Sequence, residues 1–160
     1  MTNGDTPHDV RLLQSSLAAG SVLVASIGTG TFEQIMLDGR HALTADEPVA
    51  AGGGDAGPGP YELLLMALGS CTSMTVRLYA ARKKWPLAQV IVRLRHQKVH
   101  AEDCAECESK DTMLDRIDLA LEFVGPLDDT QRARLREIAD KCPVHRTLSS
   151  KIEIRTTLSA

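Results

Sequence analysis

Alternating apolar and polar positions in the first third of the chain predict three β-strands. Residues 22–27 alternate with a period of two, and residues 31–37 and 40–45 follow as the second and third strands. Asp38-Gly39, between the last two, favours a type I′ hairpin turn, in which both central residues have positive φ. We therefore expect the fold to open with three antiparallel strands.

Residues 61–84 predict one long helix, because they contain no interior proline and are apolar on most faces as far as Val76. These 24 residues would span about 36 Å. A helix of this composition is expected to be buried, and Pro86 is expected to end it. Gly69 costs about 1 kcal/mol relative to Ala within a helix, so we expect another backbone to pack closely against it.

The segment before this helix, residues 48–60, holds five of the 12 glycines and three of the seven prolines. It has two interpretations. One is a flexible connector, and the other is a loop whose backbone approaches a site closely. It lacks the Gly-Lys-Ser/Thr ending of a phosphate-binding loop.

The second half of the chain predicts two further strands, two helices and a last strand. The strands are residues 87–100, 116–123 and 152–156, all with period-two patterns. Asp128 and Gln131 form a capping box that opens a helix, and Pro143 is placed to start a second, short one. Because strands and helices are segregated along the chain, the fold class is α+β with mainly antiparallel sheet.

Length, charge and the lengths of apolar runs indicate how many domains to expect and which classes of protein are disfavoured. The 160 residues predict a polar N-terminal extension over 1–20 and a single domain over 21–160. Eighteen basic and 21 acidic residues give a net charge of -3, which disfavours a nucleic-acid partner. The longest unbroken apolar run has six residues, so no membrane segment is expected, and no secretory signal is recognised. We therefore expect a cytoplasmic protein whose four cysteines stay reduced unless they have a chemical role.

Two of the cysteines stand in settings that matter chemically. Cys71 lies in the middle of the predicted buried helix, where a free cysteine often packs as a small apolar residue. Cys142 precedes Pro143 and would cap the short helix, so free N–H groups would lower the pKa of its thiol. His145 and Arg146 follow within one turn and would add positive charge.

The other two cysteines belong to a cluster with the spacing His-x3-His-x3-Cys-x2-Cys, made by His96, His100, Cys104 and Cys107. These are zinc-type ligands, and four of them would close one structural site. A local disulfide or redox pair, or a solvated loop with two unused thiols, fits the same residues. The motif does not match a thioredoxin site, which would open a helix after a strand.

Two separate motifs resemble the OsmC/Ohr family, the osmotically inducible and organic hydroperoxide resistance proteins. The first is Gly57-Pro-Gly-Pro-Tyr-Glu-Leu-Leu-Leu-Met-Ala-Leu-Gly-Ser-Cys71-Thr72, and the second is Asp140-Lys-Cys142-Pro-Val-His145. The order of elements agrees from about Ser21 to Leu158. The Cys-x-x-Cys loop resembles that of an OsmC-like subgroup.

The resemblance implies an intertwined homodimer with sites at its interface. It implies that Cys71 is the peroxidatic residue and Cys142 the resolving one, whereas the capping argument makes Cys142 the more acidic thiol. It also implies an organic hydroperoxide as substrate, a lipoyl or thioredoxin-type dithiol as reductant and no required cofactor. The family glutamate that orients a thiol-activating arginine is replaced by Tyr61, and Glu62 is the neighbouring acid. Arg146 or Arg40 would supply the arginine.

These residues leave three hypotheses from different classes. The first is a thiol peroxidase that acts in oxidative-stress defence and needs Cys71 and Cys142. The second is a non-catalytic protein of the same fold that binds a small apolar ligand. The third is a redox or metal sensor that uses Cys104 and Cys107.

Overall fold

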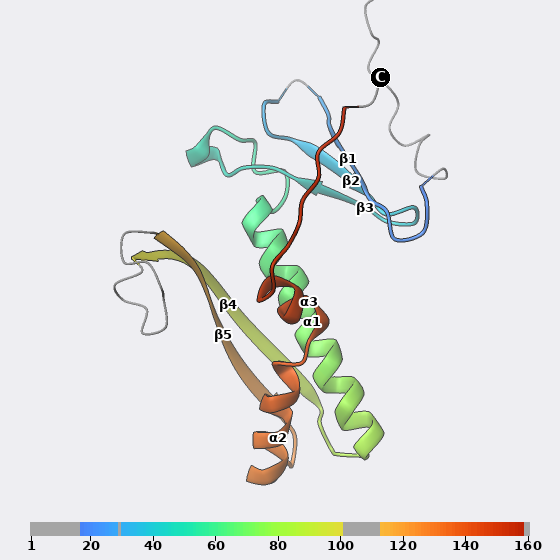
Figure 1. Ribbon diagram of the computed structural model, residues 1–160, viewed down its shortest axis with the longest axis vertical. Helices are drawn as coiled ribbons and strands as arrows, with labels where there is room; N and C mark the ends of the chain where they lie inside the picture. The colour runs from blue at the N-terminus through green and yellow to red at the C-terminus, as the bar shows by residue number, and fades with distance from the viewer. Residues whose placement is uncertain (1–16, 29, 101–112, 159–160) are drawn as a thin grey trace, which may run out of the picture. The chain divides into compact units, whose positions relative to one another are not determined.

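The computed structural model describes residues 17–28, 30–100 and 113–158, and within them it forms two compact units, Met1–Leu63 and Leu64–Ala160. Most of the predicted N-terminal extension and the loop with Cys104 and Cys107 lie outside the described residues. The strands and helices follow the predicted order as far as the short helix that begins at Pro143 (Figure 1).

The first unit holds a three-stranded antiparallel sheet in the order β1-β2-β3. The strands are β1 (Leu23–Ser26), β2 (Gln34–Leu37) and β3 (Ala42–Ala45), shorter than the sequence pattern suggested. Ile35 on the central strand lies opposite Ala25 of β1 and Thr44 of β3. Only one face of the central strand is buried, at Ile35 and Leu37.

The predicted type I′ turn between β2 and β3 is wrong. Leu37 pairs with Ala42, so the connection is a four-residue loop, residues 38–41, in which only Gly39 has positive φ (89°). The Asp38 carboxylate accepts backbone N–H groups of Arg40 (2.9 Å) and His41 (2.6 Å). This side-chain hydrogen bonding holds a wider turn than a two-residue hairpin allows.

The glycine-rich segment is an ordered loop built on one carboxylate. Asp46, which is 4% exposed, accepts the backbone N–H groups of Glu47 (2.8 Å), Gly54 (2.8 Å) and Ala56 (3.2 Å). A one-turn 3-10 helix over Val49–Ala51 lies within it. The flexible-connector interpretation therefore gives way to a loop whose backbone is tied back onto the end of β3.

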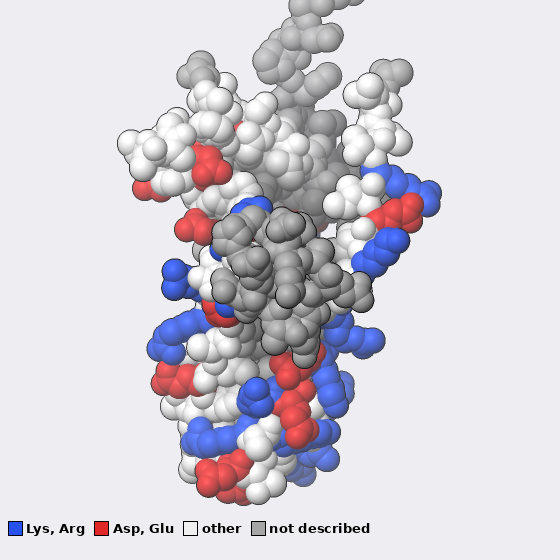
Figure 2. All heavy atoms as spheres, turned by 60° about the vertical axis from the view of Figure 1, so that its left-hand side comes forward, with Lys and Arg blue, Asp and Glu red and all other residues white. Residues whose placement is uncertain are grey.

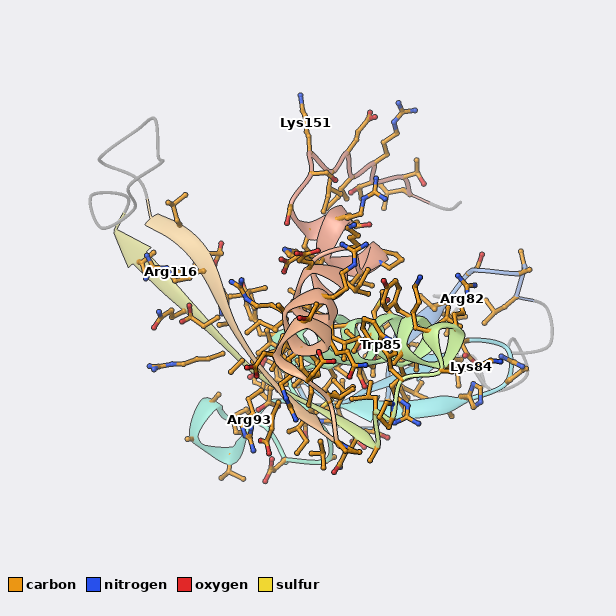
Figure 3. The ribbon with its side chains drawn as sticks, turned by 90° about the horizontal axis from the view of Figure 1, so that it is seen from below. Arg82, Lys84, Trp85, Arg93, Arg116 and Lys151 are labelled. Carbon is orange, nitrogen blue, oxygen red and sulfur yellow. The ribbon has the colours of Figure 1, made fainter. Side chains whose placement is uncertain are left out.

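The long helix α1 spans Pro60–Lys83, within one residue of its predicted bounds. At its start the Glu62 carboxylate accepts the backbone N–H of Gly59 (2.9 Å), which satisfies a donor that the helix itself leaves unpaired. At its end Lys84 takes a left-handed conformation (φ 55°) and the chain turns. Figure 3 shows Arg82 and Lys84 pointing outward while Trp85 turns inward, against the core of this unit.

Within a single chain α1 is buried on one narrow face, not on most faces as its composition predicted. Its buried residues follow a spacing of about four, at Leu68, Gly69, Thr72, Val76 and Ala80. Large apolar side chains lie exposed on the rest of the helix, among them Met66 (58%), Met74 (69%) and Leu78 (54%). By length and composition alone α1 could also cross a membrane, a test that the core helix of a soluble protein passes as well.

Gly69 permits a close approach, but by a side chain and not by the backbone that we expected. A Cβ atom at this position would lie 2.8 Å from Cδ1 of Leu94. The strand that carries Leu94 therefore packs directly over the middle of α1, one half-turn before Cys71.

The second unit pairs α1 with a long antiparallel hairpin and two further helices (Figure 1). The strands are β4 (Gln89–His100) and β5 (Met113–Val124), and the helices are α2 (Asp129–Ala139) and α3 (Pro143–Leu148). The predicted capping box is present, with both Asp128–Gln131 hydrogen bonds made. An aliphatic core joins α1 to α2 through Val76, Ala80, Leu127, Leu135 and Ala139.

The predicted last strand is wrong for the single chain. Residues 151–158 have no regular secondary structure, and Ile152 (51%) and Ile154 (85%) are exposed. A strand needs a neighbour to pair with, and none of the five strands in the described residues pairs with this segment. Alternation alone predicts strand propensity but not the partner.

Charge is mixed on the surface that Figure 2 shows, where basic and acidic side chains alternate over the lower part of the view. Ion pairs between exposed side chains include Arg93 with Glu122 at 2.9 Å. Such mixing is typical of a solvated surface rather than of a nucleic-acid-binding stripe.

Candidate functional site

The second unit brings together two cysteines that are 71 positions apart in the sequence. The Cys71 and Cys142 side chains interact, because each shifts the pKa of the other's thiol, and both are free thiols. Cys71 is half-buried, whereas Cys142 is 0% exposed. A ligand that approaches from solvent therefore meets Cys71 first.

The position of Cys142 follows from how α2 ends and α3 begins. Its backbone N–H donates to the carbonyl of Ala139 (3.1 Å), and its own carbonyl accepts the N–H of Arg146 (3.0 Å). Cys142 is thus the N-cap of α3, with Pro143 at the first helical position, as the sequence predicted. Leu135 packs α2 against α1, and Cys142, three residues after the end of α2, is completely buried.

The two thiols differ in acidity. Burial raises the pKa of Cys71, and the adjacent Cys142 raises it further, against smaller opposing effects of the Val144 backbone and of Thr75. Burial also acts to raise the pKa of Cys142, but the neighbouring Cys71 thiol, the His145 backbone and Thr72 together lower it.

Two threonines of α1 border the pair. The Thr75 hydroxyl donates to the carbonyl of Cys71 (2.8 Å). The Thr72 hydroxyl is fully buried and has no hydrogen-bond partner in the described part of the chain, and Thr72 is among the groups that lower the pKa of the Cys142 thiol. Sequence analysis missed both residues. The signal for Thr72 was a polar residue in the series Leu68, Thr72, Val76, Ala80 that proves to be the buried face.

The other predicted site residues are not part of this contact in the described structure. Glu62 caps the start of α1 through the Gly59 N–H, so its carboxylate is engaged in holding the helix end. Arg146 is exposed on α3. It is not among the groups that shift the pKa values of the two thiols. Arg40 lies in the turn after β2, in the other compact unit.

Only part of the predicted metal cluster can be described. His96 and His100 both belong to β4, whereas Cys104 and Cys107 lie outside the described residues. Nε2 of His96 lies 2.8 Å from a carboxylate oxygen of Asp115 on β5. Among the residues that the structure describes, no group of three His, Cys, Asp or Glu side chains is arranged for a metal ion.

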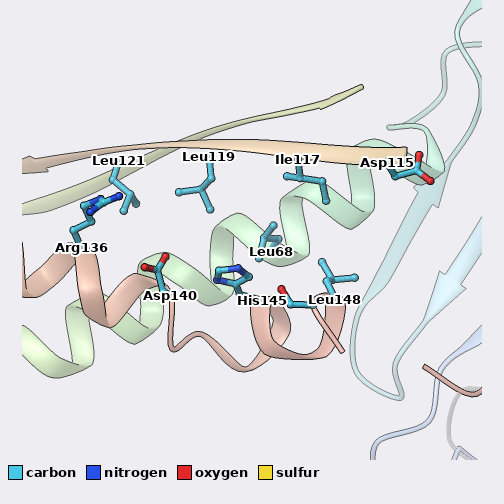
Figure 4. Close-up of a pocket in the computed structure, with 10 residues that line it drawn as sticks. Leu68, Asp115, Ile117, Leu119, Leu121, Arg136, Asp140, His145 and Leu148 are labelled. Atoms are coloured by element: carbon cyan, nitrogen blue, oxygen red, sulfur yellow. The ribbon is translucent and has the colours of Figure 1, made fainter. Parts of the chain in front are cut away.

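A pocket of about 360 Å³ opens between β5, α2 and α3. Figure 4 shows its apolar floor, in which Ile117 and Leu119 of β5 face Leu68 of α1. His145 lies on the α3 side of the pocket, and its backbone acts on the Cys142 thiol. The pocket therefore borders the segment that holds the buried cysteine, with Arg136 and Asp140 among its polar lining.

Solved structures with the same fold are numerous, and three illustrate the likeness. An OsmC-like protein from Mycoplasma pneumoniae is 18% identical, with a TM-score of 0.62 over 81% of this chain and 86% of that chain. Organic hydroperoxide resistance protein OsmC from Legionella pneumophila is 18% identical, with a TM-score of 0.57 over 82% and 91%. Organic hydroperoxide resistance protein OhrB of Bacillus subtilis is 17% identical, with a TM-score of 0.56 over 81% and 91%.

At these identities the structures establish the fold alone: an α+β fold with antiparallel sheets and a long helix. The chain has no significant match among curated protein sequences. The model of the OsmC-like protein family matches residues 52–157, a stretch that includes both cysteines of the contact and about two thirds of the chain. The chain therefore belongs to the OsmC-like family.

Proposed function

We propose that this protein is a thiol peroxidase that reduces organic hydroperoxides in oxidative-stress defence, with Cys71 and Cys142 as its reacting pair. The observation that carries the proposal is the interaction between the Cys71 and Cys142 thiols, one half-buried and one fully buried. Two fold relatives bear the name organic hydroperoxide resistance protein, which supports the same chemistry.

The proposed reaction has two steps. The Cys71 thiolate attacks the O–O bond of ROOH, forming a sulfenic acid on Cys71 and releasing RO⁻, which takes up a proton to leave as ROH. The Cys142 sulfur then attacks the sulfenic sulfur, and hydroxide leaves and becomes water on protonation. The products are an alcohol, water and a Cys71–Cys142 disulfide. A lipoyl or thioredoxin-type dithiol would reduce the disulfide in two exchange steps.

The test is to treat the reduced protein with one equivalent of an alkyl hydroperoxide, quench in acid and map disulfides by mass spectrometry. We expect a Cys71–Cys142 link and one equivalent of alcohol. With excess peroxide, Cys142→Ser should accumulate sulfinic Cys71, because no thiol intercepts the sulfenic acid. The Cys104→Ser/Cys107→Ser variant is the control, and its peroxide consumption should match that of the unchanged protein. If both thiols stay reduced while peroxide persists, the proposal fails.

We propose a homodimer as the working form, because the single chain leaves α1 half covered. Met66, Met74 and Leu78 are each more than half exposed on this helix. Residues 151–158 carry strand-like alternation but pair with no strand in the described part of the chain, so a second copy would cover both features. Light scattering at low micromolar concentration should give about twice 17.3 kDa. Met74→Glu should shift the mass toward 17.3 kDa, whereas Glu137→Gln on α2 should not. A well-folded monomer of the unchanged protein would exclude the dimer.

A second candidate function, binding of a small apolar ligand, is favoured by the pocket of about 360 Å³ beside α3. Its volume lies in the range of ligand sites, and its floor is aliphatic. A binding protein would retain ligand after Cys142→Ser, whereas the peroxidase would lose turnover. Measuring both properties on this one variant separates the two functions.

Of the remaining predictions, a zinc site at His96, His100, Cys104 and Cys107 stays a proposal, as does a cytoplasmic location. The Asp115 carboxylate on Nε2 of His96 must move if zinc is to bind through that nitrogen. Metal analysis of protein purified without chelator should give about one zinc per chain if the four ligands close a site. A value near zero rejects the site.

A further inference from the structure

We propose that the pocket between β5, α2 and α3 binds the hydrocarbon chain of an uncharged alkyl hydroperoxide, and that Asp115 and Asp140 disfavour substrates that carry a carboxylate. This inference rests on the proposed peroxidase function and names the class of hydroperoxide within it. The pocket has a volume of about 360 Å³ and lies wholly within the unit Leu64–Ala160. Its position next to the segments of the two cysteines and the charges of its lining carry the inference.

The floor of the pocket fits a straight hydrocarbon chain. Ile117, Leu119 and Leu121 occupy alternate positions of β5 and line the pocket from one face of the strand. From the first to the third they extend over about 13 Å, because a strand advances by about 3.3 Å per residue. With carbon–carbon bonds of about 1.5 Å, a chain of about eight carbons fits along this floor. Leu68 of α1 and Leu148 of α3 complete the apolar lining (Figure 4).

The pocket adjoins the chain segments of both cysteines. Leu68 precedes Cys71 by three residues on α1, and side chains three residues apart are neighbours on a helix surface. Asp140 and His145, which also line the pocket, stand two residues before and three residues after Cys142. A hydroperoxide whose chain lies on the floor is therefore bound close to the thiol pair, although neither cysteine is itself part of the lining.

The charges of the lining oppose a carboxylate. Asp115 lies at one end of the pocket, beyond Ile117, and Asp140 and Arg136 lie toward the other end (Figure 4). With His145 counted as neutral, the lining carries two negative charges and one positive. A carboxylate at either end of a ligand chain would thus approach a side chain of the same charge, and this repulsion weakens its binding.

The partners of these charges decide how strongly each one acts. Asp115 faces Nε2 of His96 at 2.8 Å and Nζ of Lys98 at 3.8 Å, so its charge is partly balanced. Asp140 and Arg136 belong to no ion pair among the residues that the structure describes. They are four residues apart at the end of α2, where they present an acceptor and a donor side by side. An uncharged hydroperoxide has both an O–H donor and oxygen acceptors, so it can bond to either group without meeting repulsion.

The first test locates the ligand and needs no peroxide. Reduced, methyl-labelled protein is titrated with octanol, and the methyl shifts are followed by NMR. We expect saturable shifts at Ile117, Leu119 and Leu148. Val22 and Leu43, which line a separate apolar pocket of about 230 Å³ in the other unit, are the internal control and should not shift. Shifts of equal size at Val22 and Leu43, or no saturable shift on the floor, would overturn the inference.

The second test measures the charge preference at Asp140. The affinities of octanol, octanoate and octylamine are measured by calorimetry at low salt and pH 7. For the unchanged protein we expect octanol to bind most tightly and octanoate about tenfold more weakly. Asp140→Asn leaves Arg136 unopposed, so octanoate should bind about threefold more tightly and octylamine about threefold more weakly, whereas octanol should change little.

Glu137→Gln is the matched control, because it removes the same charge from α2 at a position outside the pocket lining. All three affinities should stay nearly unchanged in this variant. Equal effects of the two substitutions, or tightest binding of octanoate by the unchanged protein, would show that Asp140 does not select against a carboxylate. A change of the same sign for octanoate and octylamine in Asp140→Asn would indicate altered packing instead of charge and would reject the inference as well.

The third test carries the preference to the proposed reaction. For the unchanged protein, KM for ω-hydroperoxyoctanoate should be about tenfold higher than KM for octyl hydroperoxide at a similar kcat, because the carboxylate weakens binding and not the chemical step. Equal KM values would reject the selectivity of the pocket and leave the peroxidase function standing. Binding of octanol on the floor without any consumption of peroxide would reject the peroxidase function and leave the pocket as a site for uncharged chains.

Discussion

Each of the two compact units of the chain is stabilised internally by a different kind of interaction. The unit Leu64–Ala160 is built on an aliphatic core in which Val76 and Leu135 are completely buried. The unit Met1–Leu63 buries little beyond one face of its sheet, and its long loop is organised by hydrogen bonds to the Asp46 carboxylate. Apolar packing therefore positions the thiol pair, whereas polar contacts order the glycine-rich loop that leads into α1.

This difference shows where the chain tolerates change. A packed core loses stability with every methylene group removed, at any pH. The stability of a loop whose backbone is hydrogen-bonded to a carboxylate depends little on apolar side-chain volume. It depends instead on the ionisation of that carboxylate and on glycines at the points where two backbone segments touch. The predictions below probe each unit with a substitution that should leave the other unaffected, beginning with the largest effect.

Removing core volume in the second unit should have the largest effect. Leu135→Ala should lower the free energy of unfolding by about 2–5 kcal/mol, because this side chain is fully buried between α2 and α1. Urea unfolding followed by circular dichroism measures the change. Arg136→Ala, at the exposed neighbouring position, is the control and should stay within about 0.5 kcal/mol. A loss below 1 kcal/mol for Leu135→Ala would mean that the core does not hold this unit.

A methyl group at a backbone contact should have the next largest effect, in the first unit. A Cβ atom on Gly57 would lie 2.2 Å from the Thr44 carbonyl oxygen, so Gly57→Ala must push the loop away from β3. We expect a loss of about 1–3 kcal/mol in the free energy of unfolding. Gly30→Ala, whose Cβ would meet only ordinary contacts at 3.7 Å or more, should be nearly neutral. Equal losses for the two variants would rule out the close approach as the cause.

The smallest predicted effect is a pH dependence located in the first unit. Hydrogen bonds from backbone N–H groups hold the pKa of Asp46 below its ordinary value, and the bond from Ala56 has the largest effect. A carboxyl with a lowered folded pKa stabilises the protein above its unfolded pKa of about 3.9, and this stability is lost as the pH falls through the folded value. Asp46→Asn should lower the urea midpoint at pH 7, and the difference from the unchanged protein should shrink by pH 3. A difference that is the same at both pH values would contradict the charge-based explanation.

The sequence alone determined the elements that depend on local physics. The period-two segments before residue 125 became strands, the proline-free apolar segment became α1, and the Asp128–Gln131 box and Cys142-Pro143 begin α2 and α3 as predicted. Each is decided within a few residues by backbone hydrogen bonding and capping, so neighbours along the chain suffice. The two family motifs likewise pointed to Cys71 and Cys142 and to the family of the chain.

Tertiary structure decided which face of each element is used. Because α1 is apolar nearly all round, its sequence could not indicate that Leu68, Thr72 and Val76 face inward while Met74 does not. The alternation at Ile152 and Ile154 could not show that the segment lacks a strand partner among the residues that the structure describes. Only packing reveals these choices, because burial and strand pairing depend on residues distant in sequence. The same packing brings Cys71 and Cys142, which are 71 positions apart in the sequence, into one site.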